Sequence, residues 1–490
     1  MQGYASRDAV LNILMDHETT GAFLKQLFPR HTHALAAADK GLVRAICLGV
    51  IRNQTLLDFN IDKHALKKPS GVLRAILRLS AYQIFFLKVP DFAAVNIGAE
   101  LAKQYEGVPQ AGFVNVVLKK LISEGLQKES GDSISALAVN FSHPEWLVKR
   151  WFKRLGRKGL MQALERNNQE APLWLRVNTA KARQVLKSDL SQGAASEAAV
   201  SEAAASEAAV EAVEAALLQL EVKTERDGFA PIFLKLTDDE DGSIRGGKVA
   251  LHSEFFKNGV LAFQDPAAWM IAELANWSPK ESLIDLCAAP GGKSACVMER
   301  AAYLGNAASA SDNAAKDKRV KAKKLPALIC NDISFRRLSL MNDVRERLGH
   351  RNLLPLVMDG AYSALRKTFD VVLVDAPCSN LGVLRRRPEA RWTHDAKDLQ
   401  RLAVEQRALL EQAMALCSEK GRIIYATCSP EEEETETVIA AFLKDHKNWC
   451  LVDAGEFLPP WTVKKKFLWL HPGESDYDGF FAARLERVKS

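Results

Sequence analysis

The feature that most constrains the fold is a regular alternation of short apolar runs and helical stretches after residue 280. Apolar runs of strand length lie at 283–287, 327–330, 354–358, 371–374, 422–426 and 479–485. Stretches with apolar residues at helical spacing lie between most of them, at 335–348, 398–416 and 434–443. Strands that alternate with helices indicate a doubly wound α/β domain, in which ligands bind at the carboxyl ends of the strands. Functional residues are therefore expected where the apolar runs end.

The first 130 residues or so have a different pattern. Apolar residues recur there at three- and four-residue spacing, in the stretches 9–15, 42–51, 72–87, 93–101 and 113–121. Pro90 and Gly107 separate neighbouring patterns, and the alternation typical of strands is missing. This part of the chain is predicted to be an all-helical bundle.

Composition narrows the class of protein. The chain has 490 residues, 48% apolar and 26% charged, which supplies more than one hydrophobic core and excludes wholesale disorder. A net charge of only +6 argues against a wholly basic nucleic-acid binder but allows a local basic surface. Charges interrupt the apolar stretches before they reach membrane-spanning length, and the N-terminus lacks the apolar core of a secretory signal. We expect neither a membrane protein nor a secreted one.

Eight cysteines are scattered along the chain, and no two have C-x-x-C spacing. We therefore predict neither a metal site nor a disulfide framework, and we expect the protein in the reducing cytoplasm. An important cysteine is then expected to be chemically reactive rather than structural.

Residues 141–183 carry ten basic residues against three acidic ones. Lys149, Arg150, Lys153 and Arg154 flank two aromatic residues. Considered alone, this cluster is best interpreted as an amphipathic helix with a solvated basic face. The alternative is a surface that contacts the phosphates of a nucleic acid.

Two stretches have biased composition. Residues 188–222 repeat Ser-Glu-Ala-Ala and contain seven acidic residues and no basic one. Their five-residue period matches no packing face, so a solvated insertion without chemistry is expected. Residues 305–324 are rich in Ala and Ser and then basic, and they too are interpreted as a surface insertion.

Chemically distinctive residues follow five of the apolar runs. The first run leads into Asp285-Leu-Cys-Ala-Ala-Pro-Gly-Gly-Lys293, where two glycines allow backbone N–H groups to approach a ligand before a helix begins. The next three runs end at Asp332, Asp359 and Asp375. One acid at a strand end is usually a helix cap or turn residue. Acids closing three successive strands beside a Gly-Gly turn instead predict a pocket for a nucleoside-bearing cofactor.

Two cysteines, Cys378 and Cys428, lie in polar turns at the ends of the fourth and fifth runs. A thiolate could form there and meet a substrate. The cysteines expected to be ordinary small core residues are Cys47, Cys296, Cys417 and Cys450.

Taken together, these motifs resemble the RNA cytosine-C5 methyltransferases of the NOL1/NOP2/Sun type. The resemblance covers roughly residues 140–490, apart from the two biased stretches. The motifs that carry it are Asp285–Lys293, Asp375–Ser379 and Ala426–Pro430, with flanking motifs at 259–266 and 478–481.

The helical N-terminal part is similar to the RNA-binding antitermination factor NusB, through Asp39–Arg44, Ala81–Gln83 and Gly112–Asn115. The two resemblances imply a NusB-like all-α RNA-binding bundle at 1–135 and a small α+β RNA-binding subdomain, with the basic linker and the acidic insertion, at 136–245. A Rossmann-like S-adenosylmethionine-dependent methyltransferase domain at 246–490 would follow. Such a fusion implies a monomeric bacterial enzyme that methylates 16S rRNA, either naked or within a small-subunit assembly intermediate.

The resemblance also implies roles for individual residues. In this family the cysteine of the Thr-Cys-Ser motif, here Cys428, adds to C6 of the cytosine, and the Pro-Cys cysteine, here Cys378, assists release of the product. Asp375 would interact with the base ring, and Lys293 would support the charge balance of the reaction. The residues that would hold S-adenosylmethionine are Cys287, Ala288, Ala289, Pro290, Gly291, Gly292 and Lys293, with Asp332 on the ribose, Asp359 by the adenine and Asp375 near the methionine end.

The sequence departs from the family pattern in two places. Asn380-Leu381 stands where many relatives have Gly-Thr, and the run Arg385-Arg-Arg-Pro388 is unusually basic. Both could alter contacts with the base or the RNA backbone without removing the mechanism. Beside a base-modifying site, RNA contact becomes the favoured interpretation of the basic residues at 149–154.

Two other functions stay open at this point. A DNA cytosine-C5 methyltransferase would use a Pro-Cys nucleophile, which Cys378 would supply, although the Thr-Cys-Ser motif and the helical partner domain favour the RNA type. An RNA-binding ribosome assembly factor without catalysis is the second alternative, and it ranks lower because every expected catalytic position is filled.

Overall fold

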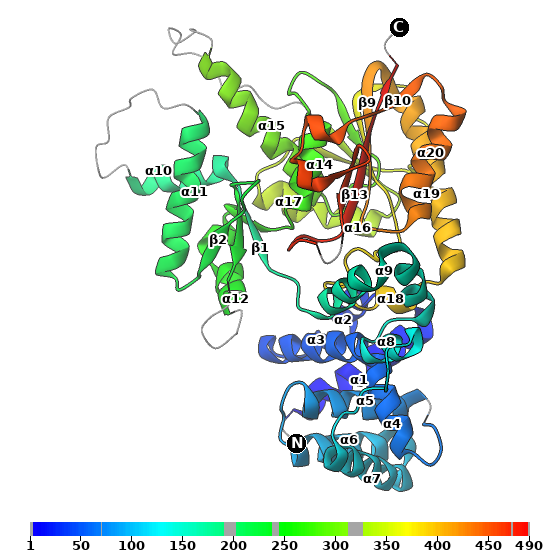
Figure 1. Cartoon of the computed structure of the whole chain (residues 1–490). Coiled ribbons are helices and arrows are strands. Elements are labelled where there is room, and N and C mark those ends of the chain that lie inside the picture. Colours follow the sequence, from blue (N-terminus) through cyan, green and yellow to red (C-terminus); the bar gives the residue numbers. More distant parts are fainter. Residues whose placement is uncertain are drawn as a thin grey trace. The chain divides into compact units, whose positions relative to one another are not determined.

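The computed structural model describes residues 3–69, 71–190, 202–237, 245–311, 327–471 and 474–488 (Figure 1). The chain forms two compact units. One comprises Met1–Glu170 and Val383–Lys397, and the other comprises Ala171–Gly382 and Asp398–Ser490. This division is coarser than the three domains expected from the sequence, whose boundaries stay a prediction. In the described part of the chain, no helix combines the length and the apolarity needed to cross a bilayer.

The first unit is helical, as predicted. Its core gathers around α5, in which every side chain from Ala75 to Ile84 is buried. Apolar residues of α1, α3 and α7 pack on this helix in one continuous cluster. The helices are α1 (Tyr4–Thr20), α2 (Leu24–Thr32), α3 (Ala37–Arg52), α4 (Gln54–His64), α5 (Gly71–Phe85), α6 (Asp91–Glu106), α7 (Val108–Glu124), α8 (Ile134–Asn140) and α9 (Glu145–Asn168).

The segment Val383–Lys397 is also part of this unit, although more than two hundred residues separate it from Glu170. It contains the short helix α18 (Ala390–Thr393). Arg391 on that helix is fully buried and donates to the Ser142 carbonyl at 2.8 Å and to Asn168 Oδ1 at 2.9 Å. Burial lowers the pKa of Arg391 to about 9.

Further hydrogen bonds fix the same segment. Trp392 Nε1 donates to the Ile51 carbonyl at 3.0 Å, and Arg52 donates to the Arg385 carbonyl at 3.0 Å. Arg385, the first residue of the basic run noted in the sequence, is itself buried. At this residue, at least, the run contributes to packing rather than to an open cationic surface.

The second unit begins with a small antiparallel sheet in the order β2-β3-β1-β4. β1 and β3 pair directly, with Leu175 opposite Leu234. The strands are β1 (Trp174–Val177), β2 (Thr224–Arg226), β3 (Phe233–Leu236) and β4 (Leu261–Phe263), and the accompanying helices are α10 (Thr179–Leu190), α11 (Glu202–Gln219), α12 (Arg245–His252) and α13 (Glu254–Lys257).

The acidic stretch at 188–222 is not a solvated insertion over its described part, so that expectation was wrong. Residues 202–219 form α11, and Val210, Val213 and Leu217 on this helix are fully buried in the core of the unit. Their spacing of three and four residues defines a helical packing face, which the five-residue Ser-Glu-Ala-Ala repeat obscures. Residues 191–201 lie outside the described residues, as do residues 312–326 of the second biased stretch; α15 continues through residue 311.

The second sheet of this unit has the order β11-β12-β13-β9-β8-β5-β6-β7 in the described residues, with β10 beside β13. The strands from β9 to β7 are parallel, whereas β10 to β13 are joined by antiparallel pairs. The strands are β5 (Leu283–Asp285), β6 (Leu328–Asp332), β7 (Leu353–Val357), β8 (Phe369–Asp375), β9 (Cys417–Thr427), β10 (Trp449–Val452), β11 (Val463–Lys464), β12 (Phe467–Leu470) and β13 (Phe480–Arg487). The strand order reverses at β5, so the switch point at which such sheets bind ligands lies between β5 and β8.

Alternate residues of these strands enter two different cores. Val371 and Leu373 of β8 belong to the cluster that includes α14 and α15, whereas Val372 and Val374 belong to the cluster with α19 and α20. Both faces of the sheet are therefore covered, as its continuous apolar strands require. The helices are α14 (Ala267–Ala275), α15 (Gly292–Ser311), α16 (Phe335–Ser339), α17 (Met341–Arg347), α19 (Ala396–Leu416) and α20 (Glu436–Asp445), with short 3₁₀ turns at Glu432–Glu434, Ala454–Glu456 and Pro460–Thr462.

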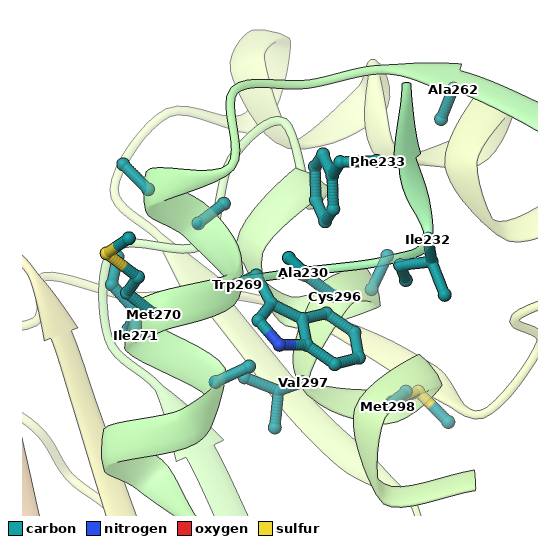
Figure 2. Packing of buried hydrophobic residues seen from close by; sticks show 14 of the residues in the cluster. Ala230, Ile232, Phe233, Ala262, Trp269, Met270, Ile271, Cys296, Val297 and Met298 are labelled. Atoms are coloured by element: carbon teal, nitrogen blue, oxygen red, sulfur yellow. The ribbon is translucent and has the colours of Figure 1, made fainter. Parts of the chain in front are cut away.

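The small sheet and the large sheet share one hydrophobic core. Trp269 of α14 lies in this core, with Phe233 of β3 edge-on at 6.2 Å between ring centroids. Figure 2 shows the Trp269 indole between Phe233 and the α15 residues around Val297. The subdomain expected to bind RNA is thus packed directly on the domain that carries the strand-end motifs. The predicted fold class, a helical bundle followed by an α+β part and an α/β domain, is confirmed.

Candidate active site

The loop between β5 and α15 holds the Gly-Gly turn. Asp285 at the end of β5 is fully buried, accepts a hydrogen bond from Ser294 Oγ at 2.6 Å and binds the backbone N–H of Cys287 at 3.2 Å. Burial raises the pKa of Asp285 to about 7. Gly291 has φ +98°, and a Cβ there would lie 2.8 Å from Met341 Cγ. The loop therefore depends on glycine at this position.

The strand-end acids converge on this loop. Burial raises the pKa of the Cys287 thiol well above its ordinary value, and the negative charges of Asp285, Asp375 and Asp332 raise it further. Asp332, at the end of β6, is buried, and its Oδ2 lies 3.3 Å from the Arg337 guanidinium without a hydrogen-bond partner among the described residues. Arg337 also donates to the Ala289 carbonyl at 3.1 Å, which links Asp332 to the loop.

Asp359 lies in a tight turn after β7. Its carboxylate accepts a hydrogen bond from the backbone N–H of Ala361 at 2.9 Å, and its side chain is exposed. The next residue, Gly360, approaches the Leu286 carbonyl so closely that a Cβ would lie 3.1 Å from that oxygen. The turn as a whole therefore lies against the end of β5.

Lys293, the last residue of the Gly-Gly motif, pairs with Asp375 at the end of β8. The ammonium lies 2.6 Å from Asp375 Oδ2, and both side chains are about a quarter exposed. Burial alone would lower the pKa of Lys293, but the charge of Asp375 and the hydrogen bond to its carboxylate outweigh burial and raise the pKa. The ammonium is therefore a stable positive charge within electrostatic reach of both thiols.

Cys378 and Cys428 are brought together from loops fifty residues apart, with their sulfur atoms 2.9 Å apart. Both are free cysteines, and Cys378 is buried whereas Cys428 is half-buried. The hydrogen bond with Cys428 and burial together raise the pKa of Cys378 well above its ordinary value. Cys428 Sγ also lies 3.3 Å from Asn380 Oδ1, at one of the positions where the sequence departs from the family pattern.

The two cysteine loops are also joined through their backbones. The Gly382 N–H donates to the Cys428 carbonyl, and the Gly479 N–H donates to the Gly382 carbonyl, each at 2.9 Å. A Cβ on Gly382 would lie 2.4 Å from the Gly479 carbonyl oxygen, so only glycine allows this approach. The Asp478-Gly-Phe-Phe motif seen in the sequence is thus part of the same site.

Four residues at or beside this site were not singled out from the sequence. Glu434 is fully buried beneath both cysteine loops and accepts hydrogen bonds from Ser379 and Ser429. Arg176, counted in the basic segment, is also fully buried and pairs with Glu299 at 2.9 Å. It hydrogen-bonds Gln264 and donates to the Gly292 carbonyl at 3.3 Å. Only Gln264 carried a signal, since it lies within the flanking motif at 259–266.

The basic residues Lys149, Arg150, Lys153 and Arg154 lie on α9 in the other unit, before a kink at Gly156. Lys149 and Lys153 are exposed, one helical turn apart, whereas Arg150 and Arg154 are half-buried. The predicted amphipathic helix is therefore present, with Trp151 on its buried face.

Comparison with known protein families accounts for most of the chain. The model of the 16S rRNA methyltransferase RsmB/F family matches residues 272–486, the NusB family matches residues 4–123, and the ferredoxin-like domain of RsmF/B-like methyltransferases matches residues 143–204. The matched methyltransferase domain is that of the RsmB/F family of 16S rRNA methyltransferases. This family is one of S-adenosylmethionine-dependent enzymes, as the sequence resemblance implied.

Two relatives match the chain over nearly its full length. The chain is 29% identical to the probable ribosomal RNA small subunit methyltransferase B of Bacillus subtilis, over 99% of this chain and all of the relative. It is 28% identical to the ribosomal RNA small subunit methyltransferase B of Vibrio cholerae, over 98% of this chain and 97% of the relative. The matches to the NusB family and to the RsmB/F methyltransferase model confirm the two resemblances expected from the sequence motifs.

Two solved structures have the same fold. The crystal structure of PH0851 superposes with a TM-score of 0.72 at 22% identity and covers 99% of both chains. The structure of NSun6 from Pyrococcus horikoshii with SFG superposes with a TM-score of 0.53 at 18% identity, over 71% of this chain and 99% of that one.

Proposed function

We propose that this enzyme transfers a methyl group from S-adenosylmethionine to C5 of one cytosine in 16S rRNA, through a covalent bond between Cys428 and C6. The observation that carries the proposal is the pair of thiols 2.9 Å apart at the ends of β8 and β9, beside the Lys293–Asp375 ion pair. Cytosine C5 is a weak nucleophile, so a second group must first add at C6. One thiol can do this while the other handles a proton.

The surroundings of the two thiols support Cys428 as the nucleophile. Cys378 is the more buried of the two, and its raised pKa keeps it protonated. A protonated, buried thiol is a poor nucleophile and suits a residue that assists release of the product. The same observation disfavours a DNA-type mechanism, in which Cys378 would have to attack.

The ion pair supplies the other groups that the reaction needs. Attack at C6 places negative charge on the pyrimidine ring, which a protonated carboxyl group that donates to N3 and a nearby ammonium stabilise. We assign Asp375 to the contact with the pyrimidine ring and Lys293 to balancing the negative charge that develops on it. After methyl transfer, a base must remove the proton on C5, and the electron pair of that C–H bond forms the C5–C6 double bond as the bond from C6 to Cys428 Sγ breaks.

The loop residues 287–293 and the strand-end acids fit S-adenosylmethionine. S-adenosylmethionine supplies the electrophilic methyl group. Asp332 would accept hydrogen bonds from the ribose hydroxyls, because its Oδ2 is buried and lacks a hydrogen-bond partner among the described residues. The turn at Asp359 would lie by the adenine, and Asp375 by the methionine end.

The basic face of α9 is assigned to the RNA. Lys149 and Lys153 are exposed with Phe152 between them, an arrangement that suits contact with phosphates and an unpaired base. The target cytosine must leave its stack to reach a thiol at the carboxyl ends of β8 and β9, which favours a loop nucleotide. We infer that the enzyme acts as a monomer in the cytoplasm, on 16S rRNA or on a small-subunit assembly intermediate.

Bisulfite sequencing of 16S rRNA tests this function. The RNA is incubated with S-adenosylmethionine and either the wild-type protein or Cys428→Ala. One cytosine protected by the wild type alone is the expected result. If Cys428→Ala still protects that cytosine, the assignment of the nucleophile is wrong. If the wild type binds the cofactor but protects no cytosine in naked RNA or in assembly intermediates, methylation of 16S rRNA at C5 is ruled out.

A further inference from the structure

Each of the two cysteines is followed by a serine, and a single buried carboxylate accepts a hydrogen bond from both serines. Ser379 Oγ donates to Glu434 Oε2 at 2.6 Å, and Ser429 Oγ donates to the same oxygen. All three side chains are fully buried. One oxygen atom thus links the loop of Cys378 to the loop of Cys428.

The other oxygen of this carboxylate extends the link to the neighbouring helix. Glu434 Oε1 accepts the backbone N–H of Ser379 at 2.8 Å and Gln406 Nε2 of α19 at 3.0 Å. Gln406 also donates to the Pro377 carbonyl at 3.0 Å, one residue before Cys378. The Pro-Cys loop is therefore held through a backbone N–H, a hydroxyl and a carbonyl.

The backbone of Glu434 is fixed as well. The Tyr425 hydroxyl donates to the Glu434 carbonyl at 2.8 Å. Tyr425 is a fully buried residue of β9, the strand that leads into Cys428. The carboxylate consequently has a defined position relative to that strand.

We propose that Glu434 is the positioning residue of the reaction: it sets the distance between Cys378 and Cys428 by holding Ser379 and Ser429 on one carboxylate. The inference deepens the proposed function, on which it rests for the roles of the two thiols. Glu434 does not act on the substrate. It acts through the two serines.

The physical reason is the cost of a buried charge. A carboxylate removed from water is tolerated only while donors surround it. Burial raises the pKa of Glu434, and the hydrogen bonds from Ser379, Ser429 and Gln406 oppose that rise. Displacing either loop would deprive the carboxylate of a donor, so the two loops hold each other in place.

The rate at which an oxidant joins the two thiols in a disulfide, here called trapping, reports how closely they are held together. The full-length protein is treated with diamide, and the Cys378–Cys428 disulfide is followed by mass spectrometry of the peptides. The test variants are Glu434→Ala, Glu434→Gln, Ser379→Ala and Ser429→Ala. The matched control is Glu432→Ala, which removes an exposed carboxylate from the same 3₁₀ turn.

In Glu434→Ala we expect trapping and kcat for methylation to fall by about tenfold or more, because small displacements of reacting groups are costly. KM for RNA and for the cofactor should stay within about twofold, since Glu434 touches neither. Glu434→Gln should recover most of both rates, because its amide can accept from the Ser379 N–H and donate to the hydroxyls. Ser379→Ala and Ser429→Ala should have trapping rates and kcat values between those of the wild type and Glu434→Ala. Adding either serine substitution to Glu434→Ala should lower neither value further.

The inference is overturned if folded Glu434→Ala traps its thiols at the wild-type rate, or if Glu432→Ala slows trapping equally. If Glu434→Ala fails to fold, the trapping rate of Ser429→Ala is the test instead. An unchanged rate in that variant overturns the inference, and a slower rate supports it. Trapping needs no RNA. Slowed trapping together with a wild type that methylates no cytosine would therefore refute the proposed function while the positioning role stands.

Discussion

The Lys293 ammonium lies 2.6 Å from the Asp375 carboxylate and 4.9 Å from the centre of the Phe480 ring. Three strands contribute to this arrangement, because Lys293 follows β5, Asp375 ends β8 and Phe480 begins β13. The pair thus places one positive charge beside both thiols by bringing together residues that are far apart in the sequence.

Replacing Lys293 by Met should slow methyl transfer by on the order of 100-fold, the usual cost of removing one electrostatic group from a site where charge develops. The negative charge on the ring would then lack its cation, and Asp375 would lack its partner. Single-turnover methylation measures the effect, and Lys420→Met, at an exposed position, is the control. Equal rates in the two variants would exclude Lys293 from the reaction.

Cys378→Ala should accumulate RNA bound covalently to the protein, because the product can form but is released slowly. Cys428→Ala should form no such adduct, and neither should the double variant. Denaturing gels of labelled RNA after incubation with S-adenosylmethionine report the adduct. An adduct in Cys428→Ala that disappears in the double variant would reverse the roles of the two cysteines.

Changing Lys149, Arg150, Lys153 and Arg154 together to Gln should weaken RNA binding and flatten its dependence on salt. Each lost contact with a single-stranded phosphate removes about 0.7 from the slope of log K against log salt. Filter binding over a range of salt concentrations gives the slope. The control changes Lys119 and Lys120, two exposed lysines of α7, in the same way. Cofactor affinity should be unchanged in both proteins.

Asp285 makes stability depend on pH. Its pKa is raised from 3.8 to about 7 in the folded protein, so the folded state binds the proton more tightly than the unfolded state. The free energy of unfolding should therefore decrease as pH rises from about 4 to about 7 and then level off, by a few kcal/mol at most. Asp285→Asn should remove this decrease. Denaturant titrations of both proteins at several pH values test it, and parallel curves would contradict it.

The strand ends could be predicted because their motifs are local: a buried run, then an acid or a glycine pair. The position of Glu434 in the site could not be predicted, because its burial depends on Ser379, which lies 55 residues away in the sequence. In addition, a run of glutamates suggests a solvated segment. Arg176 was counted only among the basic residues of 141–183, because its partner Glu299 is 123 residues away in the sequence. The error at α11 was different: the packing face of Val210, Val213 and Leu217 was present in the sequence but obscured by a more conspicuous repeat.

The segment 383–397 has a consequence for attempts to divide the protein. The polypeptide leaves the methyltransferase unit one residue after Gly382 and returns at Asp398, and in between Arg391 is enclosed by carbonyls of the helical unit. Cutting the chain at residue 170 would therefore not yield two self-sufficient pieces. The methyltransferase fragment would then contain the buried Arg391 guanidinium without its acceptors, nine residues after Gly382, which is hydrogen-bonded to Cys428. Because the helical unit is built from two separate segments of the chain, it cannot be removed or exchanged by a single cut.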